Sequence, residues 1–248
     1  MIVDGGIGSS IGVFGQGGSV ARSKWKSWAI TLSFLIIWTL VLFASSLLIF
    51  LFLYLVGISE GMALSISGIL TYIILIPLTL LFIHLDGNLD RTKQMLSFDS
   101  AKRALILLLG IPLVITIIDF LLSMIYTVVW LGIFGEPSTN TDLGTSWESD
   151  TIEIAMLFVS VAILTPIVEE LMFRGYILDA IKRNHSDWTA IIWSSILFGL
   201  IHLDTFVMGQ AFMGGILYGW IRIRTDSLLP SIAGHMMWNL LALSLTYL

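Results

Sequence analysis

Long apolar runs with few charged residues recur along this chain, and they restrict its fold more than any other feature. Seven runs are separated by polar stretches, and the first four exceed the roughly 20 residues that a transmembrane helix needs. We therefore expect an all-α polytopic membrane protein with about seven transmembrane helices. The expected spans run from about Trp28 to Val56, Met62 to His84, Ala104 to Phe134, Ile152 to Ile181, Trp188 to Leu203, Met208 to Ile221, and Leu228 to the C-terminus.

The composition agrees with a membrane protein. Only 12% of the 248 residues are charged, whereas a soluble domain has about 25%. The chain has no cysteine, which excludes a disulfide framework, a thiolate metal site and a cysteine nucleophile. Residues 1–21 lack the charged and apolar regions of a cleavable signal. We expect a multi-pass protein of the cell membrane, with lipids around it and no nucleic acid partner.

The order of the spans suggests three parts. Residues 1–26 are predicted to be a flexible lead-in, residues 27–150 to contain three spans, and residues 151–248 to form a catalytic domain of four helices. A charged loop is expected at 85–103 and an acidic one at 135–151. The spans that contain Pro112 and Pro166 are expected to kink or bend at these residues.

The positions of the charges predict how the chain is oriented. All twelve Lys and Arg residues lie in the lead-in, in the loop 85–103, after Glu170 or in the loop 222–227. With seven spans, these regions share one face of the membrane, and the loops on the other face carry only acidic charges. The positive-inside rule then places the N-terminus in the cytoplasm and the C-terminus outside.

Two adjacent carboxylates and an arginine interrupt the fourth apolar run. An ionisable side chain at the centre of a bilayer costs about 2.5 to 3.5 kcal/mol, so these groups need partners or a cavity. Glu170 and Arg174 are spaced i, i+4 and are expected to pair. Glu169 projects about 100° away from Glu170 around the helix and is available to act as a general base on water. The alternative is that both carboxylates only balance Arg174.

Two histidines in later spans are candidates for the same site. His202 follows Phe198 by four residues, and His235 precedes Asn239 by four, so each pair lies on one helix face. At 1.5 Å per residue, Glu169, His202 and His235 reach overlapping depths in the membrane. One Glu and two His form a familiar zinc set, although no H-E-x-x-H pair is present. The spacing fits zinc and a metal-free base equally. The small residues Gly215 and Gly219 are assigned to close helix packing.

These motifs, taken in order, resemble those of the CPBP family. The chain has Glu169-Glu170-x-x-x-Arg174, then Phe198-x-x-x-His202, then His235-x-x-x-Asn239. The family comprises the type II CAAX prenyl endopeptidases and the bacteriocin-processing or Abi proteins, and the resemblance covers roughly residues 152–247. It implies an intramembrane endopeptidase with catalytic Glu169, His202, His235 and Asn239.

The resemblance also implies individual roles. Glu169 would activate water, His202 would help to hold that water, and His235 with Asn239 would bind the oxyanion. Glu170, Arg174 and Phe198 would be supporting residues. No cofactor is favoured, but zinc on Glu169, His202 and His235 stays open, because the family is often described as metalloproteases.

We expect hydrolysis of a peptide bond near the end of a membrane-associated or lipidated substrate, with prenylation undecided. Two alternatives of other classes stay open. One is a membrane immunity or scaffold protein that binds a peptide without cutting it. The other is a proton-coupled transporter, which would also use intramembrane Glu and His, although the sequence has no obvious inverted repeat.

Overall fold

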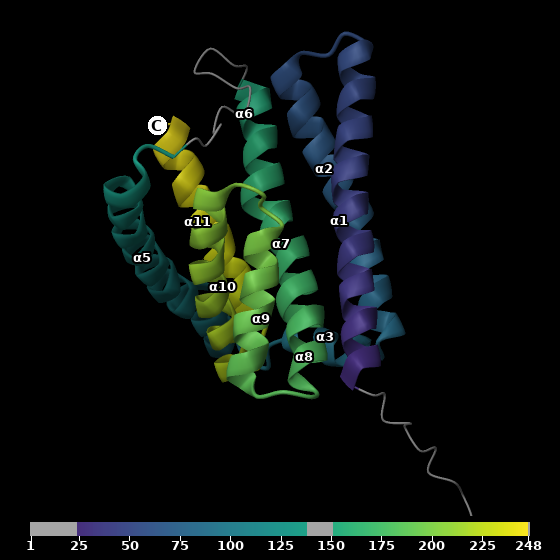
Figure 1. Cartoon of the computed structure of the whole chain (residues 1–248), viewed down its shortest axis with the longest axis vertical. Coiled ribbons are helices and arrows are strands. Elements are labelled where there is room, and N and C mark those ends of the chain that lie inside the picture. Colours follow the sequence, from purple (N-terminus) through teal and green to yellow (C-terminus); the bar gives the residue numbers. More distant parts are fainter. Residues whose placement is uncertain (1–23, 138–150, 248) are drawn as a thin grey trace, which may run out of the picture.

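The computed structural model of this chain describes residues 24–137 and 151–247, which contain helices and turns and no strand (Figure 1). Most of the expected lead-in and of the acidic loop lies outside the described residues. In chain order the elements are α1 (Lys24–Leu55), α2 (Glu60–Leu85), α3 (Leu89–Met95), α4 (Ala101–Leu105), the π-helical turn η1 (Ile106–Gly110), α5 (Ile111–Phe134), α6 (Thr151–Phe158), the π-helical turn η2 (Val159–Leu164), α7 (Thr165–Glu170), the π-helical turn η3 (Leu171–Ile177), α8 (Leu178–Lys182), α9 (Asp187–Leu200), α10 (Thr205–Thr225) and α11 (Leu229–Tyr247).

Each of the seven apolar segments predicted from the sequence is a helix, with ends that differ by a few residues. Four stretches among the described residues are long and apolar enough to cross a membrane: Trp28–Leu55, Glu60–Leu85, Ala101–Phe134 and Thr151–Lys182. The helix Asp187–Leu200 is apolar but shorter. The all-helical class is confirmed, whereas the number of crossings and the orientation of the chain stay predictions.

Two local expectations were wrong. The charged loop predicted at 85–103 contains the short helix α3 and the start of α4. The fifth helix ends at Leu200 instead of Leu203, and the backbone of Leu203 has a positive φ of 60°. Asp204 then caps α10 by accepting the backbone N–H groups of Phe206 and Val207 at 2.9 and 3.0 Å. This cap fixes the turn in which His202 lies.

Two of the π-helical turns come directly before prolines in the long helices. Proline has no N–H to donate and its ring clashes with the carbonyl four residues earlier, so a regular α-helix cannot continue through it undisturbed. Here the helix widens instead: Ile111 donates to the carbonyl of Ile106 ahead of Pro112, and Thr165 donates to that of Ser160 ahead of Pro166. The expected distortions at both prolines therefore take the form of π-helical turns.

The helix formed by α6 to α8 lies between the other elements (Figure 1). The hairpin of α1 and α2 lies on one side of it, and α5, α10 and α11 lie on the other. Its segment 168–181 supplies much of the largest buried cluster, in which Phe173 meets Trp38 of α1 edge-on with ring centroids 6.2 Å apart. Apolar side chains of α1 and α5 face outward, as expected for surfaces in contact with lipid, for example Leu48 and Val128.

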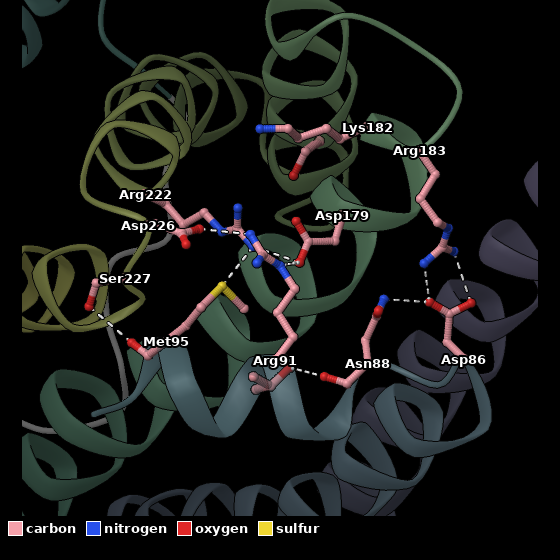
Figure 2. A network of polar contacts seen from close by, with 12 residues as sticks. Asp86, Asn88, Arg91, Met95, Asp179, Lys182, Arg183, Arg222, Asp226 and Ser227 are labelled. Carbon is pink, nitrogen blue, oxygen red and sulfur yellow. Dashed lines mark hydrogen bonds and ion pairs between the residues drawn. The ribbon is translucent and has the colours of Figure 1, made fainter. Parts of the chain in front are cut away.

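Ion pairs join the two halves of the chain at one end of the molecule (Figure 2). Asp179 of α8 binds Arg222 of α10 at 2.6 Å and lies 3.6 Å from Arg91 of α3. Arg183 pairs with Asp86, just after α2, through two contacts of 2.6 and 2.9 Å. Basic side chains from both halves therefore gather at this end, which agrees with the one-sided charge distribution of the sequence.

Candidate active site

A cavity of about 370 Å³ lies among α2, α5, α9, α10, α11 and the helix formed by α6 to α8. Its lining includes five of the seven residues singled out from the sequence: Glu169, Phe198, His202, His235 and Asn239. These residues come from three separate helical segments and the turn after α9. Their convergence agrees with the expectation that the three motifs share one buried site.

Glu169 presents a carboxylate to this cavity while being only 6% exposed. Its Oε2 atom is buried, has no hydrogen-bond partner among the described residues, and lies 3.9 Å from Nε2 of His235. A buried carboxylate oxygen without a protein partner loses the hydrogen bonds that it would have in water. A water molecule in the cavity would restore them, which is the arrangement a general base requires.

Glu170 and Arg174 form the pair predicted from their spacing, behind the cavity wall. Nη1 of Arg174 donates to Oε1 of Glu170 at 2.8 Å, and both side chains are fully buried. Nη2 of Arg174 donates to the backbone carbonyl of Gly215 at 3.2 Å, and its guanidinium lies 4.4 Å from the centre of the Phe198 ring. The cation thus holds one carboxylate of the pair and leaves Glu169 to the cavity.

His235 is oriented by Glu170. Its Nδ1 lies 3.1 Å from Oε1 of Glu170. The same Oε1 accepts from Nη1 of Arg174, so it is an acceptor here too, and Nδ1 carries the proton of this hydrogen bond. Nε2, on the Glu169 side, is then an acceptor in the neutral ring and a donor only in the doubly protonated ring. This constrains the oxyanion role that the family resemblance implies.

His202 is oriented in a similar way by the backbone. Its Nδ1 lies 2.9 Å from the carbonyl oxygen of Phe198. A carbonyl oxygen only accepts, so Nδ1 is the protonated nitrogen and Nε2 has a free lone pair in the neutral ring. The Phe198 ring packs edge-on against the imidazole with centroids 5.0 Å apart. Phe198 therefore supports His202 through both its backbone and its ring.

Asn239 has a structural contact that its motif did not predict. Its Nδ2 donates to the carbonyl of Val161 at 2.9 Å, within η2. In a π-helical turn, this carbonyl would bond the N–H five residues later, which is Pro166 and has none. Asn239 therefore supplies a donor that the helix lacks, and the second N–H of its amide is left for other partners.

Two residues of the cavity wall were missed by the sequence analysis. Asp119 of α5 and Tyr218 of α10 both line the cavity, and the Tyr218 hydroxyl donates to Oδ2 of Asp119 at 2.6 Å. Asp119 is the one charged residue in the third apolar run. A lone carboxylate inside a membrane span was the signal that could have identified it. Tyr218 has no comparable signal, since aromatic residues are common in such helices.

A bound zinc ion would require the three candidate ligands to converge more closely than they do. Among residues 24–137 and 151–247, no group of three or more His, Asp or Glu side chains lies close enough to hold a metal ion. The Nδ1 bonds of His202 and His235 nevertheless resemble the outer-shell contacts that orient histidine ligands of metals.

Comparison with known proteins adds a family similarity for this region. A model of the Rce1-like type II CAAX prenyl endopeptidases matches residues 151–241. The protein named "Putative membrane peptidase YdiL", from Bacillus subtilis (strain 168), is 30% identical over 91 residues, which are 36% of this chain and 37% of that protein. The similarity therefore spans little more than a third of the relative's length. No solved structure matches the chain.

The matched region contains all seven residues singled out from the sequence, whereas Asp119 lies outside it. The four apolar helices and these similarities together identify a multi-pass integral membrane protein.

Proposed function

We propose, from the similarity of residues 151–241 to the Rce1-like endopeptidases, that this chain is an intramembrane endopeptidase whose Glu169 activates a water molecule. One observation supports this more than any other. The buried Oε2 of Glu169 has no hydrogen-bond partner within residues 24–137 and 151–247, and it faces a cavity that also presents His202 and His235. A polar cavity with a partly desolvated carboxylate and two oriented imidazoles suits hydrolysis.

In the proposed reaction, Glu169 takes a proton from water as the water oxygen bonds to the scissile carbonyl carbon. The free Nε2 of His202 accepts the second proton of that water in a hydrogen bond and so orients it. The carbonyl becomes a tetrahedral oxyanion. When the C–N bond breaks, the proton held by Glu169 passes to the leaving amine, which restores the carboxylate.

The oxyanion needs donors aimed at it. The second N–H of the Asn239 amide is one donor. Nε2 of His235 is the other when its ring is doubly protonated, and the adjacent Glu170 carboxylate then stabilises the imidazolium. The expected oxyanion role of His235 is kept in this proposal, with the condition that the ring is charged.

The substrate is proposed to be a membrane-associated or lipidated peptide. A second cavity of about 420 Å³ lies on the neighbouring faces of α11, α6 and η2. Its lining is apolar and includes Ala162, Met236 and Leu240, which neighbour residues of the polar cavity in sequence. A peptide bond in the polar cavity would therefore lie beside an apolar surface suited to an attached hydrocarbon chain.

The test is Glu169→Gln, which keeps the shape of the side chain and removes the anion. Cleavage of a quenched lipopeptide should fall by about 10² to 10⁴, the usual contribution of a general base. Elution in detergent and the melting temperature should change little. Glu170→Gln is the comparison variant, because it alters the neighbouring carboxylate and leaves the base in place. It should lower stability through its pair with Arg174, and it should lower kcat less than Glu169→Gln does, through its contact with His235. Full activity in Glu169→Gln would refute the mechanism.

Zinc-dependent hydrolysis at the same cavity is the second candidate, favoured by the oriented Nδ1 bonds of both histidines. Zinc would need Glu169, His202 and His235 as its ligands, and these side chains do not converge closely enough among the described residues to hold it, so no step is assigned to a metal. We expect enzyme dialysed against a chelator to keep its activity. Zinc that is stoichiometric, tracks activity and is lost in His202→Ala would establish the metal mechanism instead.

A further inference from the structure

Asp119 has no part in the mechanism above, yet its burial requires an explanation. It is 3% exposed, in the middle of α5, among otherwise uncharged residues of the third apolar run. A carboxylate at this depth is costly unless it is paired or serves a function. Its contacts therefore show what the first half of the chain contributes to the site.

Asp119 and Tyr218 connect α5 to His235. Oδ2 of Asp119 accepts the hydroxyl of Tyr218 at 2.6 Å. The Tyr218 ring stacks on the imidazole of His235, with centroids 5.3 Å apart and planes 15° from parallel. The hydroxyl contact fixes the far end of the ring, and the ring covers one face of the imidazole.

The neighbouring helix leaves space for this carboxylate. A Cβ atom at Gly214 of α10 would lie 3.2 Å from Oδ2 and 3.4 Å from Oδ1 of Asp119. Both distances are tight for a carbon beside a carboxylate oxygen. The absence of a side chain at Gly214 therefore lets Asp119 reach Tyr218, one helical turn further along α10.

We propose that Asp119 and Tyr218 are positioning residues, which hold the imidazole of His235 in the orientation needed at the reacting carbonyl. The inference rests on the proposed function, in which His235 contributes to the oxyanion site. Glu170 fixes the imidazole at Nδ1, and the ring of Tyr218 fixes its plane. The face of the stacked phenol ring also stabilises the charged imidazolium.

The first test is kinetic. Tyr218→Phe keeps the ring and removes the hydroxyl, while Asp119→Ala removes the acceptor. Each should lower kcat by about 10-fold to 100-fold, as for other small displacements of catalytic groups, with KM nearly unchanged. The double variant should be no worse than either single one, because both changes break the same hydrogen bond. Asp119→Asn should retain more activity than Asp119→Ala, since its carbonyl oxygen can still accept.

The background His235→Ala separates positioning from direct substrate contact. If Asp119 acts through His235, then Asp119→Ala and Tyr218→Phe should have no further effect in that background. If Asp119→Ala raises KM, and raises it again when added to His235→Ala, then Asp119 binds the substrate itself and the inference is overturned.

Thr116→Val is the matched structural control. Thr116 also lies on α5, and its hydroxyl donates to the backbone carbonyl of Gly234 on α11 at 3.2 Å, without contact to the Asp119–Tyr218 hydrogen bond itself. This variant should lower the melting temperature and leave kcat unchanged. If Thr116→Val and Tyr218→Phe lower kcat equally, the effect reflects general loosening of α5, and the inference fails.

The second test does not depend on activity. The chain has four histidines, so isotope labelling of histidine gives a small set of imidazole NMR signals. The His235 signal is identified by its loss in His235→Ala. It should shift in Tyr218→Phe and Asp119→Ala, because the stacked ring moves, and stay in place in Thr116→Val. An unmoved signal in both variants refutes the inference. A shifted signal together with full activity in Glu169→Gln would instead refute only the proposed function.

Discussion

At the scale of single residues, Asn239 combines two tasks that a sequence motif cannot separate. One N–H of its amide bonds the carbonyl of Val161, whose partner in the helix is removed by Pro166. The other is proposed to bind the oxyanion. The family resemblance implied only the second task, because the contact with Val161 depends on how α11 packs against η2.

Asn239→Ala should therefore lower both turnover and stability. We expect kcat to fall by about 10² to 10³ through the lost oxyanion donor. We also expect a lower melting temperature, because the Val161 carbonyl is left without a donor. Assays of kcat, KM and thermal unfolding in detergent measure the two effects. A stable variant with wild-type kcat would contradict both tasks.

Pro166→Ala separates the two tasks, because alanine restores a backbone N–H that can donate to the carbonyl of Val161 in η2. In that background, Asn239→Ala should lose less stability while kcat still falls. An equal loss of stability in both backgrounds would show that the helix does not use the restored donor.

Sequence spacing predicted contacts within one helix well and contacts between helices poorly. The pair of Glu170 and Arg174 is confirmed, because i, i+4 neighbours meet in any helix. The contact of Glu170 with His235 depends on how α7 and α11 pack, so spacing carried no information about it. Asp119 is a different case. Its isolation in an apolar run was visible in the sequence and could have identified it.

At the scale of elements, Gly199 is a glycine at which an added side chain would meet the backbone of another helix. A Cβ atom at Gly199 would lie 2.9 Å from the backbone oxygen of Met208 in α10. Gly215 and Gly219 also pack closely, as predicted, but against side chains, with nearest distances of 3.0 and 3.4 Å. A backbone atom cannot rotate away as a side chain can, so the crossing of α9 and α10 depends most on Gly199.

Gly199→Ala should destabilise the protein by about 1 to 3 kcal/mol, as overpacking usually does. Gly132→Ala is the control, because Gly132 lies in α5 with nothing within 4 Å of the added Cβ. That variant should be neutral or slightly more stable. Thermal unfolding in one detergent compares the two. Equal melting temperatures would mean that α9 and α10 can move apart at no cost.

The helices themselves were predicted because apolar length is a strong signal, whereas their ends depend on local polar contacts. The short α3 lies in a charged stretch, and ion pairs such as that of Arg91 with Asp226, at 2.7 Å, join it to the far end of α10. The early end of α9 is followed by the capping contact of Asp204. Neither feature changes the hydropathy of the segment, so neither was visible in the apolar pattern.

At the scale of the whole molecule, the orientation in the membrane can be tested at the two ends of one continuous helix. Asp99 and Glu136 flank the helix Ala101–Phe134, and both are exposed. The positive-inside rule predicts that Glu136→Cys reacts with an impermeant reagent on intact cells, and that Asp99→Cys reacts only after permeabilisation. Native thiols give no background, because the chain has no cysteine.

Reaction of Asp99→Cys on intact cells would show that the chain has the opposite orientation.

The walls of the polar cavity come from two regions of the chain with different relationships to known proteins. Glu169, His202 and His235 belong to the region that matches the family, whereas Tyr72 and Asp119 come from helices before it. The family similarity thus covers the proposed reacting groups and leaves out part of the surrounding wall. Two relatives can share every catalytic group and still differ in which peptides they accept. Exchanging residues 24–137 between such relatives, with the rest unchanged, is therefore a direct way to change selectivity without changing the chemistry.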